Sequence, residues 1–74
     1  PPIDEYSRIL IEEYCMSHNS AKSRRLMKLL NKSYNIESEM TDAEAIFLEK
    51  AIDSEKDEEL REALQELDGF LCGY

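Results

Sequence analysis

Hydrophobic residues recur at helical spacing in four stretches of the chain, and polar segments separate these stretches. The first stretch begins near Ile3, with Asp4 and Glu5 in the first turn, where acidic side chains complement the helix dipole. Its polar residues fall on one narrow helical face, and its apolar residues cover most of the remaining surface. An apolar arc this wide predicts a helix that is central in a bundle or that also faces a second chain.

The second stretch is amphipathic from about Ser20 to Ser33 or Tyr34, after a polar break at residues 17–20. One side of the predicted helix is rich in leucine. The opposite side carries four cations, which are Arg24, Arg25, Lys28 and Lys32. The positive residues are therefore predicted to form one solvated helical face and not a disordered tail.

The third stretch follows a polar connector at residues 35–40 and starts with the clearest local signal in the chain. Thr41 and Glu44 have the spacing of a capping box, in which each side chain accepts a hydrogen bond from the other residue's backbone amide. The helix predicted from this point is apolar over more than half of its circumference.

Residues 53–59 contain no apolar side chain, which favours a helix break at Asp53–Ser54 over one continuous helix, with Ser54 as the cap of the next helix. The fourth stretch then presents leucines at intervals of four, three and four residues: Leu60, Leu64, Leu67 and Leu71. Gly69 is predicted to be the C-cap of this helix. The apolar residues from Phe70 to Tyr74 are predicted to fold back on the bundle or onto a partner.

Composition supports an all-α fold. The chain of 74 residues has no valine, one threonine and two glycines, whereas strand-rich domains need β-branched runs and turn glycines. We predict a single helical domain over residues 1–74, a small bundle of three or four short helices in which the first and third are the most buried. Because so short a chain is only marginally stable alone, we expect dimerisation or a partner to complete the bundle. The predicted core residues are Ile9, Leu10, Tyr14, Leu26, Leu30, Phe47, Leu48, Ile52, Leu60, Leu64 and Leu67.

Charged residues are sorted by their position in the chain. Between Glu13 and Glu37 there are five cations and no acid, whereas thirteen acids and only three cations lie from Glu37 to Asp68. The net charge is −8. Surfaces of opposite sign on one small body influence how a protein meets partners or copies of itself.

These features favour a non-enzymatic protein–protein interaction module. An acidic helical surface can dock on a basic partner, as the surfaces of small regulators, inhibitors, antitoxins, immunity proteins and adaptors do. The segment without apolar residues and the helix after it supply the predicted partner-binding acids: Glu55, Asp57, Glu58, Glu59, Glu62 and Glu66. We expect a basic protein partner, and a homodimer or an obligate heteromer.

Two alternatives remain open. The basic face of the second helix, with Arg24, Arg25, Lys28 and Lys32, could contact phosphates in a nucleic-acid-associated protein. The net negative charge and the acidic start of the next helix weigh against that function. The other alternative is a structural oligomerisation subunit, in which the wide apolar faces are the whole function.

No motif for catalysis or cofactor binding stands out. Cys15 and His18 have a spacing that could supply two metal ligands or a catalytic dyad, but a structural zinc site needs four ligands and no further pair is present. We therefore expect no enzyme activity, no metal and no cofactor. Cys15 and Cys72 are expected to be reduced thiols of a cytoplasmic protein, and the sequence contains neither a signal-peptide pattern nor a membrane-spanning run.

Overall fold

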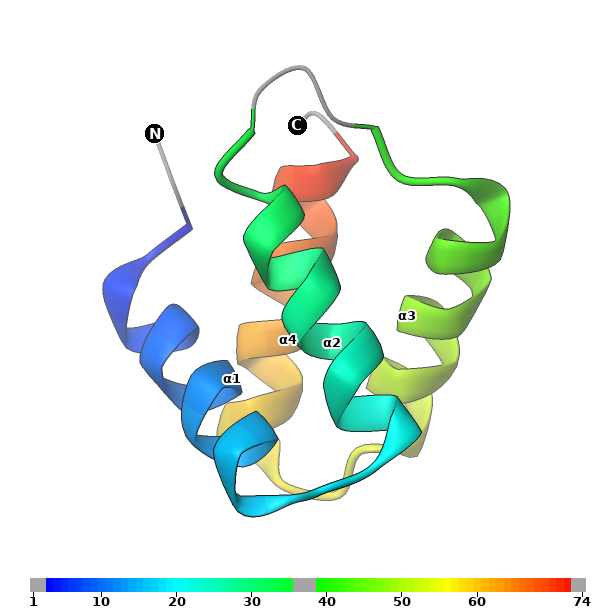
Figure 1. The fold of residues 1–74 in the computed structure, drawn as a ribbon. Coiled ribbons are helices and arrows are strands. Elements are labelled where there is room, and N and C mark those ends of the chain that lie inside the picture. The colour runs from blue at the N-terminus through cyan, green and yellow to red at the C-terminus, as the bar shows by residue number, and fades with distance from the viewer. Residues whose placement is uncertain (1–2, 36–38, 73–74) are drawn as a thin grey trace.

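The computed structural model of the protein describes residues 3–35 and 39–72, and this part of the chain folds into four helices without strands (Figure 1). The helices are α1 (Glu5–Ser17), α2 (Ala21–Lys32), α3 (Asp42–Ser54) and α4 (Glu58–Leu71). Helix α4 lies behind α2 in Figure 1, α1 packs against both of them, and α3 packs mainly against α4. The predicted all-α bundle is confirmed, and the predicted dimerisation stays a prediction.

Each helix begins at a side chain that accepts a hydrogen bond from the first turn. These caps are Asp4, Ser20, Thr41 and Asp57. The predicted capping box of Thr41 and Glu44 is present, with both of its hydrogen bonds. The break between the third and fourth helices is confirmed as well. However, Asp57 caps α4, not Ser54, because the chain stays extended at Glu55 before the next helix begins.

The core is built mainly from leucines of α2 and α4. The fully buried large side chains are Ile11, Leu26, Leu29, Leu30, Leu48, Leu64 and Leu67. Six predicted core leucines are buried as expected: Leu26, Leu30, Leu48, Leu60, Leu64 and Leu67. Four other predicted core residues are only partly buried and pack against this cluster: Leu10, Tyr14, Phe47 and Ile52.

Two predictions about burial are wrong. Helices α2 and α4 contribute four buried residues each, whereas α1 and α3 contribute two each, so the first and third helices are not the most buried. In α1 the inner face runs through Ile3, Ser7 and Ile11, and Ile9 is 39% exposed. The serine in the middle of this inner face concealed it in the sequence pattern, because a buried stripe is expected to be apolar throughout.

Helix α4 also extends further than predicted. It continues through Gly69 to Leu71, and Cys72 is the C-cap, so the prediction of a Gly69 cap is wrong. Phe70 and Leu71 are partly buried and pack against the core, which favours another helical turn over an early stop. Of the predicted folded-back tail, residues 73–74 lie outside the described residues.

Candidate interaction surfaces

The acidic residues predicted to bind a partner are mostly engaged in contacts within the chain. Glu66 accepts hydrogen bonds from the Asp4 backbone amide at 3.0 Å and from the Ser7 hydroxyl at 2.9 Å. Ser7 is 6% exposed and Glu66 lies on α4, so this carboxylate ties the start of α1 to the last turns of α4. Glu59 accepts a hydrogen bond from the Tyr6 hydroxyl. This hydrogen bond and the negative charge of Glu59 raise the pKa of the Tyr6 phenol above its ordinary value of 10.0.

The remaining members of this predicted set lie at the start of α4. Glu55 lies 3.9 Å from Lys22 and accepts a hydrogen bond from the backbone amide of Asp57, which itself caps the helix. Glu58 pairs with Arg61 at 2.5 Å, and this contact raises the pKa of the guanidinium. Glu62 is exposed and has no hydrogen-bond or ion-pair partner in the described part of the chain. Of the six acids, Glu62 is thus the one without a hydrogen bond or ion pair, although its charge contributes to the raised pKa of Arg61.

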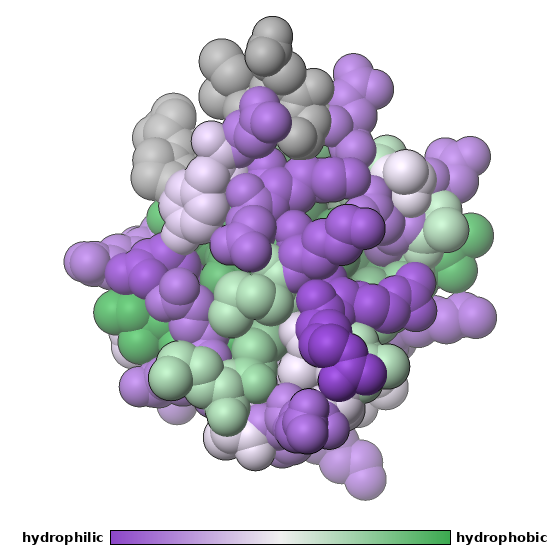
Figure 2. All heavy atoms as spheres, viewed as in Figure 1, coloured by the Kyte–Doolittle hydropathy of each residue, from purple (hydrophilic) through white to green (hydrophobic). Residues whose placement is uncertain are grey.

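A second acidic surface lies on the outer face of α3. It consists of four exposed residues at positions i, i+4, i+7 and i+11, which we call the acidic stripe: Asp42, Ile46, Glu49 and Asp53. Its three carboxylates have no partner among residues 3–35 and 39–72. Ile46 is 56% exposed between them, and Figure 2 shows a small hydrophobic patch at the right edge of the molecule, over α3.

The acidic stripe was not predicted from the sequence. The signal was present, because helical residues at these intervals share one face. The dense acidic run at residues 53–59 obscures this signal, because the stripe is defined by helical spacing and not by charge density. Charge density alone does not distinguish acids that cap and brace the fold from acids that are left without partners.

The four cations of the predicted basic face differ in their surroundings. Arg24 reaches the side chain of Asn19, and Arg25 lies over the Phe47 ring with 4.0 Å to its centroid. Lys32 donates hydrogen bonds to the Glu44 carboxylate at 2.7 Å and to a backbone carbonyl of the connector. Lys28 is exposed and has no partner in the described part of the chain. The face therefore keeps a positive charge, although one of its cations is neutralised internally.

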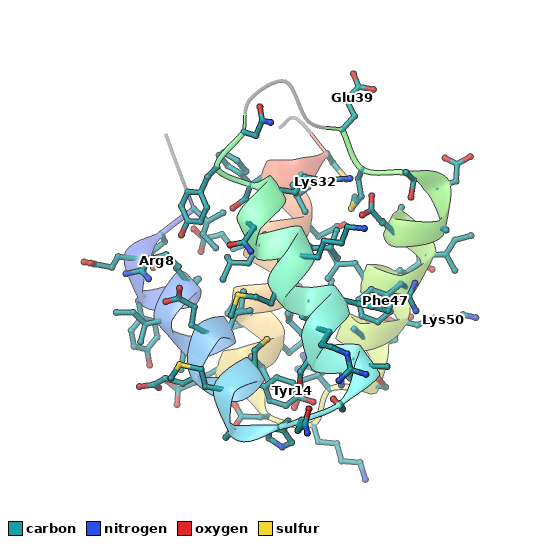
Figure 3. All side chains as sticks on the ribbon, viewed as in Figure 1. Arg8, Tyr14, Lys32, Glu39, Phe47 and Lys50 are labelled. Atoms are coloured by element: carbon teal, nitrogen blue, oxygen red, sulfur yellow. The ribbon has the colours of Figure 1, made fainter. Side chains whose placement is uncertain are left out.

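These cations border a groove between α2 and α3, with a volume of about 320 Å³, which we call the α2–α3 groove. Its lining comes from both helices: Arg25, Lys28, Leu29, Lys32, Thr41, Glu44 and Phe47. Figure 3 shows Lys32 on α2 and the Phe47 ring between the two helices, whereas Lys50 points away from the bundle. The groove thus combines an apolar floor with a positively charged wall on α2.

Glu44 illustrates how this groove holds a carboxylate. The hydrogen bond from Lys32 and the backbone amide of Thr41 hold the pKa of Glu44 below its ordinary value of 4.5. Stabilisation of the charged form by donors of this kind is what lowers the pKa of a carboxyl group.

The thiols and the histidine do not line the α2–α3 groove, and Cys15 and His18 border a separate depression with Arg24. Partial burial raises the pKa of the Cys15 thiol, and Cys72 is exposed beside Asp68, with its pKa also raised. His18 is the C-cap of α1 and stacks on Tyr14 with 4.2 Å between ring centroids, as expected for a histidine at a helix end. Within residues 3–35 and 39–72, no three His, Cys, Asp or Glu side chains are grouped as a metal would require.

Comparisons of the chain with known protein families, curated proteins and solved structures found no match. In the described part of the chain, every helix is too short or too polar to cross a membrane. Function therefore has to be argued from the surfaces themselves.

Proposed function

We propose that the protein is a non-enzymatic interaction module, a small regulator or inhibitor that docks on a basic protein through an acidic helical surface. The observation that supports this proposal is the acidic stripe, whose three carboxylates have no partner among the described residues. Carboxylates that stabilise no internal contact remain available to an external cation, and Ile46 adds an exposed apolar side chain at their centre. Interfaces commonly combine an apolar anchor with charges that set orientation and association rate.

The predicted acids of α4 have a secondary part in this proposal. Glu62 and the paired Glu58 remain exposed and add to the negative potential. Glu55, Asp57, Glu59 and Glu66 all take part in contacts within the chain. Because replacing those four would disturb the fold as well as the surface, they are poor probes of docking.

The test is a charge reversal on the acidic stripe, Glu49→Lys/Asp53→Lys. The matched control is Glu13→Lys/Glu39→Lys, which changes the net charge equally at exposed positions whose carboxylates have no hydrogen-bond or ion-pair partner in the described residues. Wild type and control should capture the same basic protein from a lysate, identified by mass spectrometry, and release it as salt rises. The stripe variant should bind it about 30-fold more weakly, because two pairs of about 0.5 kcal/mol each become repulsive, a change of about 2 kcal/mol.

Circular dichroism checks that both variants keep the helical content of the wild type. Equal capture by the stripe variant and the wild type would contradict the proposal. Equal loss in both variants would show that total charge, and not the α3 surface, controls binding.

A further inference from the structure

The α2–α3 groove offers positive charge that the chain itself does not neutralise. Lys28 has no partner in the described residues, and Arg25 contacts the face of an aromatic ring rather than a carboxylate. Lys32 donates two hydrogen bonds, which leaves one of its three N–H groups for a further acceptor. Beneath these cations, Leu29 and Phe47 form an apolar floor. The chemistry that fits is an acidic segment with one apolar side chain.

The chain itself carries a segment of this kind. Three α2 residues line the groove at intervals of four and three: Arg25, Leu29 and Lys32. In the acidic stripe, Asp42, Ile46 and Glu49 repeat the same intervals on an exposed face. The charged ends of each set are seven residues apart, or about 10 Å along a helix, and an apolar residue stands between them in both. The two surfaces are therefore complementary in sign, spacing and position of the apolar side chain.

We infer that a second copy of this chain docks its acidic stripe in the α2–α3 groove. In a parallel register, Asp42 of one copy faces Arg25 of the other, and Glu49 faces Lys32. Ile46 then packs on the partly buried Phe47 ring, because Leu29 between the two cations is only 1% exposed. Because the stripe and the groove are different surfaces, the contact is heterologous. Repetition of the contact gives a closed ring or an open chain of copies.

The net charge of −8 opposes association of two copies at long range. At an ionic strength of 0.15 M this repulsion is screened beyond about 8 Å, whereas charges that touch in the groove are screened much less. Association is therefore tested at 0.15 M salt and at chain concentrations from about 10 µM to about 1 mM, the range of weak and transient interfaces.

The experiment measures mass by sedimentation for the wild type, for a groove variant and for a stripe variant. The groove variant is Arg25→Glu/Lys28→Glu, and the stripe variant is Glu49→Lys/Asp53→Lys. The wild type should exceed the 8.6 kDa of one chain as its concentration rises, and each variant alone should stay at that mass. An equimolar mixture of the two variants should associate again, because the intact groove of the stripe variant can then receive the intact stripe of the groove variant.

Two single substitutions distinguish a loss of association from a loss of folding. Lys28→Glu alters a side chain without an internal partner, and Lys56→Glu makes the same charge change in the exposed segment before α4. The first should weaken association by at least fivefold and the second by less than twofold. A wild type that remains monomeric up to 1 mM, or a mixture that does not associate, would overturn the inference. The groove variant keeps its acidic stripe, so it should still capture a basic protein even though it no longer self-associates. Failure of self-association and failure of the proposed function are therefore distinguishable.

Discussion

Replacement of Glu66 by alanine should destabilise the fold, although the residue is exposed. Its carboxylate receives the Ser7 hydroxyl at 2.9 Å and the Asp4 amide at 3.0 Å, and these bonds join elements that are far apart in sequence. Glu66→Ala removes both bonds and leaves the hydroxyl of a residue that is 6% exposed without this partner. The matched control is Glu62→Ala, the same change on the same helix at an exposed position without a partner.

The magnitude follows from the two hydrogen bonds. A hydrogen bond to a charged group typically contributes about 1.5–3 kcal/mol. The bond from Asp4 is exposed, so water replaces most of its contribution, and the bond from Ser7 is part-buried. We expect Glu66→Ala to lower the free energy of unfolding by about 1–2 kcal/mol. In a domain of this size, that corresponds to a fall in Tm of about 4–8 °C for each kcal/mol.

The assay is urea unfolding at pH 7, followed by circular dichroism, with Glu62→Ala expected within about 0.5 kcal/mol of the wild type. A cycle with Ser7→Ala isolates the bond itself, and we expect a coupling of about 1 kcal/mol. The reasoning would be refuted by equal stability of Glu66→Ala and Glu62→Ala. Additive effects of Ser7→Ala and Glu66→Ala would refute the assigned contact even if both changes destabilise.

Two further predictions concern the core and the groove. Ile11→Ala should cost about 2–5 kcal/mol in urea unfolding, because its side chain is fully buried, whereas Ile9→Ala on the outer side of α1 should cost less than about 1 kcal/mol. Since the folded-state pKa of Glu44 is lowered, its contribution is complete above the ordinary value of 4.5 and is lost as pH falls through the lowered value. The stability difference between wild type and Glu44→Gln should therefore shrink below about pH 4.5 in unfolding measured from pH 7 to pH 3; a constant difference would contradict the assignment.

The helices and most of the core were predictable because their signals are local. The capping box at Thr41 and the leucine intervals of α4 depend on residues within a few turns of one another. The inner face of α1 was not predictable in this way, because apolar residues surround most of that helix and periodicity cannot select between its sides. The observed inner face is defined by long-range contacts, which include the burial of Ile11 and the hydrogen bond from the Ser7 hydroxyl to the Glu66 carboxylate.

The candidate site was harder to predict for a related reason. A sequence shows how many acids a segment has, but not which of them the fold uses. Glu66 and Asp57 look like surface charges in the sequence, yet one joins two helices and the other caps one. The acids of the α3 stripe look no different, and only the three-dimensional contacts show that they lack partners.

Helix α3 carries the acidic stripe on its outer face and one wall of the α2–α3 groove on another. A basic partner and the groove of a second copy would therefore compete for the acidic stripe, and Glu49 takes part in both contacts. By mass action, self-association lowers the concentration of free stripes as the protein becomes more concentrated, so the apparent affinity for a basic partner should fall with increasing chain concentration. The Lys28→Glu change, which leaves the stripe untouched, should shift that dependence to chain concentrations at least fivefold higher. Two surfaces of opposite sign on one small bundle would then regulate each other without any change in the fold.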